Sequence, residues 1–581
     1  MTFTQRKSAL AIAVALMGSM AAGCAPSEQS TSAPDGDAVT TTTEVRAETS
    51  ENEVLRQDVH VRQRAPAMAD AATAPQAEFS RIAATGSRIS NLSEPMPHPH
   101  STTVDRENYA EINANPVHRV VKQPVSTFSI DVDTGSYSNI RRMLNNGRLP
   151  PQNAVRVEEM INYFGYDYEV PSAGDAPFSV QVEQAQTPWN KNTRLLQIGL
   201  QGYQPDPSTI PASNLVFLLD VSGSMNAPDK LPLLVNSLKM LTRELSEDDR
   251  VAVVVYAGAS GLVLESTPGN EHATIAAALN KLSAGGSTNG GAGIELAYAQ
   301  ARQGFIEGGV NRVILATDGD FNVGTVNFDS LVDLVERQRD SGIALTTLGF
   351  GQGNYNDHLM EQLADAGNGN HAYIDGLNEA RKVLVDELTA TLMMIAKDVK
   401  IQIEFNPAVV AEYRLIGYEN RLLDREDFNN DAVDAGDIGA GHTVTALYEI
   451  ALVGSGGERV DPLRYQSAEA QNEGRTAITR NPSDEIAFLR LRYKAPDAEE
   501  SQLIERPIAL EKESSISPRL AWAASVAAFG QHLAGGTYLN DFDLSDIKAL
   551  AQPARGDDPF GYRAEFIQLL RLTESLGLAQ N

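Results

Sequence analysis

An apolar run that ends in three oxygen-bearing side chains constrains the fold of this chain more than any other stretch. Residues 214–225 read NLVFLLDVSGSM, and residues 215–219 are all apolar, as in a strand covered on both faces of a parallel sheet. Asp220, Ser222 and Ser224 follow at alternate positions, with Gly223 permitting a sharp turn. A carboxylate and two hydroxyls at this end of a strand predict a hard-oxygen site for Mg²⁺ or Mn²⁺. Ligands of open α/β sheets usually bind at that edge.

The motif Asp220-x-Ser222-x-Ser224 resembles the first part of the metal-ion-dependent adhesion site of von Willebrand factor type A (VWA) domains. Residues 285–291, GGSTNGG, resemble the second loop of that site, and the resemblance implies Thr288 as a ligand. Residues 312–319, RVILATDG, read as another apolar strand that ends in an acid, and Asp318 resembles the third contribution. All three parts occur in order, which favours a site over turn residues that merely follow strands.

The stretch 186–395 alternates between strand-like and helix-like patterns. We expect strands over 195–200, 214–219, 250–256, 261–265, 312–317, 343–350 and 371–374, and helices over 231–245, 272–282, 294–305, 328–341, 357–366 and 377–395. This alternation predicts an α/β fold with a doubly wound, mainly parallel sheet of the VWA or Rossmann-like kind.

Two further modules are expected on either side of the VWA module. Residues 105–185 predict an N-terminal α+β module, and residues 396–581 predict a β-rich segment, similar to a β-sandwich, followed by helices. The segment 128–164, FSIDVDTGSYSNIRRMLNNGRLPPQNAVRVEEMINYF, closely resembles the N-terminal region of bacterial YfbK-like VWA lipoproteins. The block 415–570 resembles their C-terminal region, so the resemblance covers nearly everything after about residue 100.

The beginning of the chain predicts export and a lipid anchor. Residues 1–23 combine a basic start with a short apolar run, which is typical of a signal peptide. The small residues before Cys24 resemble a bacterial lipobox, which implies lipidation of Cys24; a cleaved signal with a chance cysteine is the alternative. Residues 24–104 predict a disordered tether. Ala25 is not aspartate, which favours the outer membrane of a bacterial envelope over the inner one, facing either the periplasm or the outside.

The negative net charge of the chain excludes some classes of binding partner. A formal net charge of −29 argues against nucleic acid, and a single cysteine excludes an intramolecular disulfide. An acidic protein can nevertheless bind an acidic group through a bound cation.

The resemblance implies how such a cation is held. Ser222 and Ser224 coordinate it directly, Thr288 does so directly or through water, and Asp220 and Asp318 act largely through water. The open position then accepts an Asp or Glu carboxylate of a protein partner. Mg²⁺ is the expected ion, with Mn²⁺ and Ca²⁺ as alternatives.

Two other functions remain open from the sequence. The VWA module would be a scaffold in envelope assembly if the metal only stabilised its loops. Metal-assisted hydrolysis would require a general base, and none of the three site loops contains a histidine, so we expect no enzyme.

Overall fold

The structure is a computed structural model that describes residues 107–172, 176–206, 209–288, 290–319, 328–353, 355–461, 485–496, 498–511 and 515–580. The expected signal peptide (1–23), the lipidation site Cys24 and the expected tether (24–104) lie outside the described residues. Among the residues that are described, no helix is long and apolar enough to cross a membrane.

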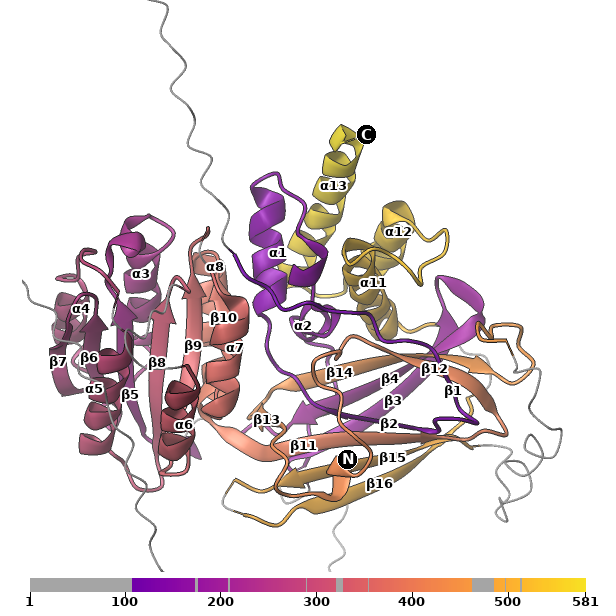
Figure 1. The fold of residues 1–581 in the computed structure, drawn as a ribbon, viewed down its shortest axis with the longest axis horizontal. Helices are drawn as coiled ribbons and strands as arrows, with labels where there is room; N and C mark the ends of the chain where they lie inside the picture. The colour runs from indigo at the N-terminus through magenta and orange to yellow at the C-terminus, as the bar shows by residue number, and fades with distance from the viewer. Residues whose placement is uncertain are drawn as a thin grey trace, which may run out of the picture. The chain divides into compact units, whose positions relative to one another are not determined.

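A six-stranded sheet occupies the middle of the chain (Figure 1). Its strands lie in the order β10-β9-β8-β5-β6-β7, and all neighbours run parallel except the edge strand β7, which is antiparallel to β6. The strands are β5 (Ser213–Asp220), β6 (Arg250–Tyr256), β7 (Ser260–Pro268), β8 (Val310–Thr317), β9 (Ala344–Phe350) and β10 (His371–Ile374). The doubly wound, mainly parallel α/β sheet predicted from the sequence is confirmed.

Helices cover both faces of this sheet. One face packs against α3 (Leu231–Leu241), α4 (His272–Leu279) and α8 (Leu377–Arg381), and the other against α5 (Gly290–Gln303), α6 (Phe328–Arg339) and α7 (Asp357–Ala366). Strand β5 serves both cores, because Leu215, Phe217 and Leu219 join the first and Val216 and Leu218 join the second. Successive strand residues point to opposite faces, so a strand buried on both sides needs an uninterrupted apolar run.

Two antiparallel sheets form a β-sandwich. One has the order β1-β12-β14-β4-β3, and the other has the order β13-β11-β15-β16 with β2 paired to β11. The strands are β1 (His118–Arg119), β2 (Val125–Ser129), β3 (Phe178–Thr187), β4 (Asn190–Gly202), β11 (Met394–Phe405), β12 (Val410–Ile416), β13 (Gly436–Gly439), β14 (Thr443–Leu452), β15 (Glu485–Lys494) and β16 (Gln502–Ala509). Buried side chains of both sheets, including Ile198, Ile401, Tyr448 and Leu489, meet in one core.

A layer of helices covers the outer face of the first sandwich sheet. It consists of α1 (Gly135–Asn145), α2 (Val157–Asn162), α11 (Pro518–Leu533), α12 (Leu544–Ala554) and α13 (Tyr562–Gln580). Helix α11 lies in the middle of this layer, and its Trp522 ring packs at 5.3 Å from Phe164 and 5.2 Å from Phe566, measured between ring centroids. Leu195 and Leu447 from the sheet join the same core.

The two flanking segments, which we expected as separate modules, share the sandwich. Strand β2 from the N-terminal segment pairs with β11, and β3 continues the sheet that contains β12 and β14. Strand β4, which the sequence placed with the VWA module, pairs with β14 instead. The pattern of apolar residues in a strand does not specify which strand it pairs with when the partner is hundreds of residues away. The sequence therefore could not reveal these pairings.

The last helix of the VWA module is shorter than expected. In place of one helix over 377–395, the chain forms α8, a π-helical turn η4 (Lys382–Asp386) and α9 (Leu388–Leu392), and β11 begins at Met394. Ile395 and Ala396 are buried in the sandwich core. Burial in that core outweighs helix propensity at these positions.

Candidate metal centre

The residues proposed as metal ligands gather at the carboxyl ends of two adjacent strands. Strands β5 and β8 run parallel with Leu219 beside Ala316, so Asp220 and the segment that follows Thr317 come to the same edge of the sheet. Asp220 and Asp318 are both fully buried. The sheet therefore brings together two carboxylates that are far apart in the sequence.

Asp220 is fixed by hydrogen bonds from three different strand ends. Its Oδ1 accepts from the backbone N–H of Ser222 at 2.8 Å, and its Oδ2 accepts from the hydroxyls of Thr317 at 3.0 Å and Tyr256 at 3.3 Å. Burial raises the pKa of Asp220, and the nearby charge of Asp318 adds to this, whereas the bonds from Ser222 and Thr317 oppose it. The carboxylate is thus held in one orientation at a site where a cation would stabilise its charge.

The two serines follow Asp220 in a tight loop, and their hydroxyl oxygens lie 3.0 Å apart. Ser222 is buried, whereas Ser224 is exposed. The backbone N–H of Gly223 donates to the carbonyl of Gly286 at 3.1 Å, which joins this loop to the predicted second loop.

The second loop brings Thr288 to the same end of the sheet. The backbone N–H of Gly285 donates to the carbonyl of Val221 at 2.8 Å, so the loop is attached to the segment directly after Asp220. Thr288 is half-buried and lies just before α5. Gly286 has a φ of +85°, a backbone conformation that favours glycine, which explains part of the glycine content of this loop.

A lysine that we did not predict lies inside the candidate centre. The ammonium of Lys230, directly before α3, contacts Asp318 Oδ2 at 2.8 Å, and the Lys230 side chain is only 9% exposed. The sequence offered no signal for this contact, because Lys230 follows the turn residues Pro228 and Asp229 and looks like a solvated loop residue.

The donor set fits a hard divalent cation. The candidate ligands Asp220, Ser222, Ser224, Thr288 and Asp318 all carry carboxylate or hydroxyl oxygens, and their segments meet at one edge of the sheet. Oxygen donors of this kind suit Mg²⁺, Mn²⁺ or Ca²⁺. The two acids are fully buried, whereas Ser224 is exposed. Among the described candidate ligands, Ser224 is therefore the one most accessible to a group from outside.

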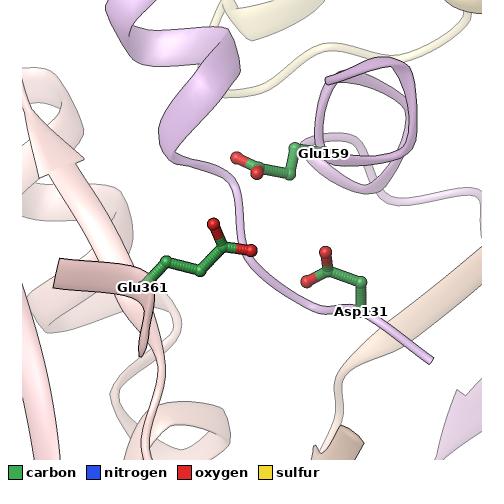
Figure 2. A group of neighbouring side chains, drawn as sticks. All are labelled: Asp131, Glu159 and Glu361. Carbon is green, nitrogen blue, oxygen red and sulfur yellow. The ribbon is translucent and has the colours of Figure 1, made fainter. Parts of the chain in front are cut away.

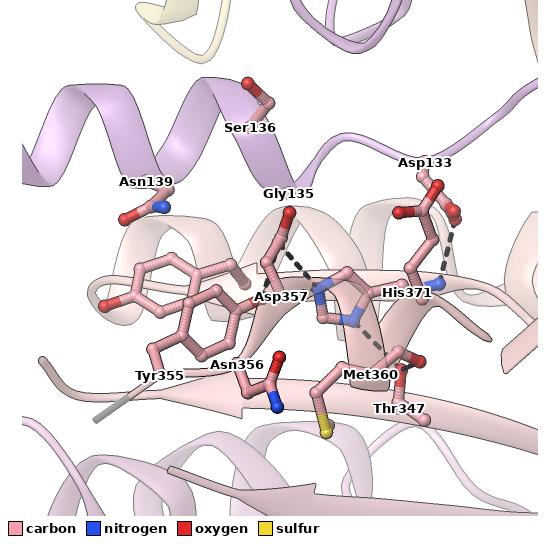
Figure 3. A network of polar contacts seen from close by, with 12 residues as sticks. Asp133, Gly135, Ser136, Asn139, Thr347, Tyr355, Asn356, Asp357, Met360 and His371 are labelled. Carbon is pink, nitrogen blue, oxygen red and sulfur yellow. Dashed lines mark hydrogen bonds and ion pairs between the residues drawn. The ribbon is translucent and has the colours of Figure 1, made fainter. Parts of the chain in front are cut away.

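A buried histidine network ties the neighbouring elements together (Figure 3). The Nδ1 atom of His371 on β10 lies 2.9 Å from the Thr347 hydroxyl on β9, and its Nε2 lies 3.6 Å from Asp357 Oδ1 on α7. The backbone N–H of His371 donates to Asp133 Oδ1 at 2.9 Å, in the loop before α1. The network links the VWA sheet to the segment that precedes it.

Gly319, directly after Asp318, packs against the segment that leads into this network. Gly319 has a φ of +87°, and a Cβ atom there would lie 2.5 Å from the backbone nitrogen of Asn356. Only glycine fits such a close backbone approach. Asn356 caps α7 by accepting from the Leu359 N–H, directly before Asp357. The position of Asp318 is therefore set by the same segment that supports His371.

Three buried carboxylates form a second acidic group, and Figure 2 shows them pointing toward one another. Asp131, Glu159 and Glu361 have oxygens within 4.8 Å of one another. Arg156 contacts Glu159 at 3.3 Å and Glu361 at 3.2 Å, and Arg421 contacts Asp131 at 3.1 Å and Glu361 at 3.0 Å. Burial raises the pKa of Glu361 to about 7, although both arginines oppose that shift. Because arginines already supply positive charge here, we interpret this group as a structural ion network.

Three family models match separate parts of the chain. The von Willebrand factor type A domain matches residues 214–386, the C-terminal region of the uncharacterized protein YfbK matches residues 390–576, and a von Willebrand factor model matches residues 103–197. VWA domains commonly mediate protein interactions and often bind a divalent metal.

The chain is similar to several known proteins. The chain is 48% identical over 483 residues to the uncharacterized protein YfbK of Escherichia coli (strain K12), which covers 82% of this chain and 83% of that protein. It is 30% identical over 187 residues to the uncharacterized protein sll0103 of Synechocystis sp., covering 32% of this chain and 43% of that protein. A solved von Willebrand factor type A structure from Catenulispora acidiphila has 16% identity and a TM-score of 0.39, and covers 69% of this chain and 91% of that one. The chain belongs to the YfbK family of bacterial VWA-domain proteins.

Proposed function

We propose that this protein binds a protein partner through a divalent cation held by Asp220, Ser222, Ser224, Thr288 and Asp318. The observation that carries the proposal is that two fully buried carboxylates and two joined loops, which contain the candidate hydroxyl ligands, meet at one sheet edge. The donors are all hard oxygens, and we propose Mg²⁺ as the ion, with Mn²⁺ and Ca²⁺ as the alternatives.

The arrangement of the residues favours capture of an acidic group. The two carboxylates are fully buried, whereas Ser224 is exposed. A cation bound there would offer its open position to an oxygen from outside, such as an Asp or Glu carboxylate. This would let a chain with a net charge of −29 bind an acidic partner.

We propose binding rather than catalysis at this centre. Tyr256, whose hydroxyl contacts Asp220, has a pKa raised well above its ordinary value by burial, so it remains a protonated hydrogen-bond donor. Lys230 is engaged with Asp318. Neither group is suited to take a proton from a water molecule, which metal-assisted hydrolysis would require.

We also propose that the protein is anchored in the bacterial envelope through a lipid on Cys24. The support is the signal-like segment 1–23 and the small residues before the cysteine. We propose the outer membrane because Ala25 is not aspartate. Stable anchoring requires more than one acyl chain on the cysteine, because a single chain binds a membrane only marginally.

Metal-dependent capture of envelope proteins tests the partner proposal. The immobilised protein is incubated with envelope extract in Mg²⁺ or in chelator, and the retained proteins are quantified. We expect partners to be retained in Mg²⁺ and lost with chelator or with Thr288→Val, which replaces the hydroxyl with a methyl group of similar size. Thr267→Val, at a half-buried position on β7, is the control and should retain them. Equal retention by all forms, with or without chelator, would favour the scaffold function instead.

A further inference from the structure

The side chain of Lys230 packs against Gly351 at the edge of the sheet. A Cβ atom at Gly351, directly after β9, would lie 2.3 Å from Lys230 Cε and 2.4 Å from its Cγ. The aliphatic part of Lys230 therefore occupies the space that a side chain at position 351 would fill. The side chain is held in this position by packing as well as by charge.

The ammonium of Lys230 neutralises Asp318. The Nζ–Oδ2 distance is 2.8 Å, and the side chains are 9% and 0% exposed. Opposite charges attract strongly at this distance when water is largely excluded. Asp318 therefore already has a cation, whereas Asp220 is held by N–H and O–H donors from Ser222, Tyr256 and Thr317.

A divalent ion that uses Asp318 has to approach the same carboxylate. Lys230 and the ion repel each other, because both are positive and both face Asp318. The two carboxylates supply two negative charges, and the ion together with Lys230 supplies three positive ones. The loaded centre then carries an excess positive charge, which an incoming carboxylate would cancel.

We propose that Lys230 is an internal cation that competes with the divalent ion for Asp318 and so makes stable metal binding depend on an anionic ligand. This rests on the proposed function of the same centre and adds its regulation. Linkage requires reciprocity: a carboxylate that tightens metal binding is itself bound more tightly in the presence of the metal.

The test is Mn²⁺ binding to the whole protein, measured by calorimetry in sodium chloride and in sodium acetate of equal ionic strength. Acetate serves as the probe for a partner carboxylate. We expect the wild type to bind Mn²⁺ more tightly in acetate than in chloride. Lys230→Met should bind Mn²⁺ in chloride at least about tenfold more tightly than the wild type, with a smaller acetate effect, because the competing charge is gone.

Two further variants separate charge from packing. Lys230→Gln is a second neutral form, needed if the methionine variant does not fold, and should show the same gain in affinity. Lys230→Arg keeps the charge and should bind Mn²⁺ as weakly as the wild type. In both neutral variants Asp318 lacks the ammonium of Lys230. The midpoint of thermal unfolding of these variants should therefore fall in chelator and recover with Mn²⁺, unlike that of the wild type.

The outcomes distinguish this inference from the proposed function. Equal Mn²⁺ affinity and equal acetate effect in the wild type and both neutral variants would overturn the role of Lys230 and leave the metal centre in place. Binding in the neutral variants alone would support the role of Lys230. Absence of Mn²⁺ binding in every form would overturn both proposals.

Discussion

Replacing Arg141 by methionine removes a buried cation that joins three parts of the fold. The Arg141 guanidinium on α1 contacts Asp375 at 2.5 Å, directly after β10, Glu379 on α8 at 2.7 Å, and Glu565 on α13 at 3.0 Å. Its own side chain is 4% exposed. This one residue therefore holds the start of the last VWA helix between a helix before the VWA module and a helix after it.

The magnitude follows from the burial of the partners. The Glu379 side chain is 0% exposed and that of Asp375 is 12% exposed, so both would lose their cation in a poorly hydrated environment. Removing one member of a buried ion pair costs about 3–5 kcal/mol, because the remaining charge is uncompensated. Glu565 is 35% exposed and contributes little after solvent screening. Methionine retains much of the apolar stem, so the loss of about 3–5 kcal/mol should be mainly electrostatic.

Urea-induced unfolding, followed by far-ultraviolet circular dichroism, measures this loss. Arg339→Met is the matched control, because Arg339 pairs with Asp434 at 2.9 Å with side chains 24% and 59% exposed, and should cost less than about 1 kcal/mol. Adding Glu379→Gln to Arg141→Met should recover part of the loss, because it removes an uncompensated charge. The reasoning is refuted if Arg141→Met costs no more than the control.

Three other predictions concern the ion network, the sheet and the anchor. Burial raises the pKa of Glu158 to about 8 and of Glu361 to about 7, so the folded state binds more protons than the unfolded state between about pH 5 and 8. Stability should therefore fall as pH rises through this window, by up to about 1.4 kcal/mol per pH unit for each group, and Glu158→Gln should reduce the slope in a series of urea titrations. Gly369→Ala should destabilise the protein by about 3 kcal/mol or more, because its Cβ would lie 1.7 Å from the Leu345 carbonyl oxygen. The control is Gly376→Ala, whose Cβ meets open space and which should change the midpoint of thermal unfolding little. Cys24→Ser should move the protein from the membrane fraction to the soluble fraction, and an unchanged distribution would contradict lipid anchoring.

Much of the VWA module could be predicted because short stretches of its sequence are enough to indicate its strands and helices. The apolar run 215–219 specifies a strand buried on both faces, and it lies in β5 as expected. The candidate ligand Asp220 ends such a strand and Asp318 directly follows another, and parallel strands place their carboxyl ends on one edge. The proximity of these two acids therefore follows from the two apolar strand patterns and from the parallel arrangement of the strands.

The contacts that the sequence could not reveal are those set by tertiary structure. Lys230 reaches Asp318 only because Gly351, on a distant strand end, leaves room for its side chain. Strand β4 belongs to the sandwich rather than to the VWA sheet because its partner β14 lies far along the chain. The last helix ends early because Ile395 is buried in the sandwich core. In each case the deciding neighbour is remote in sequence and leaves no periodic signal.

Calorimetric titration of the purified protein with Mg²⁺ in sodium acetate, beside Asp220→Asn, Thr288→Val and Lys230→Met, tests the central claim most directly. Asp220→Asn keeps the size of the side chain and removes its charge, and circular dichroism verifies that each variant is folded. The account predicts saturable Mg²⁺ binding in the wild type that is lost or strongly weakened in Asp220→Asn and Thr288→Val. No saturable binding in either the wild type or Lys230→Met, or undiminished binding in folded Asp220→Asn, would contradict a cation site at the ends of β5 and β8.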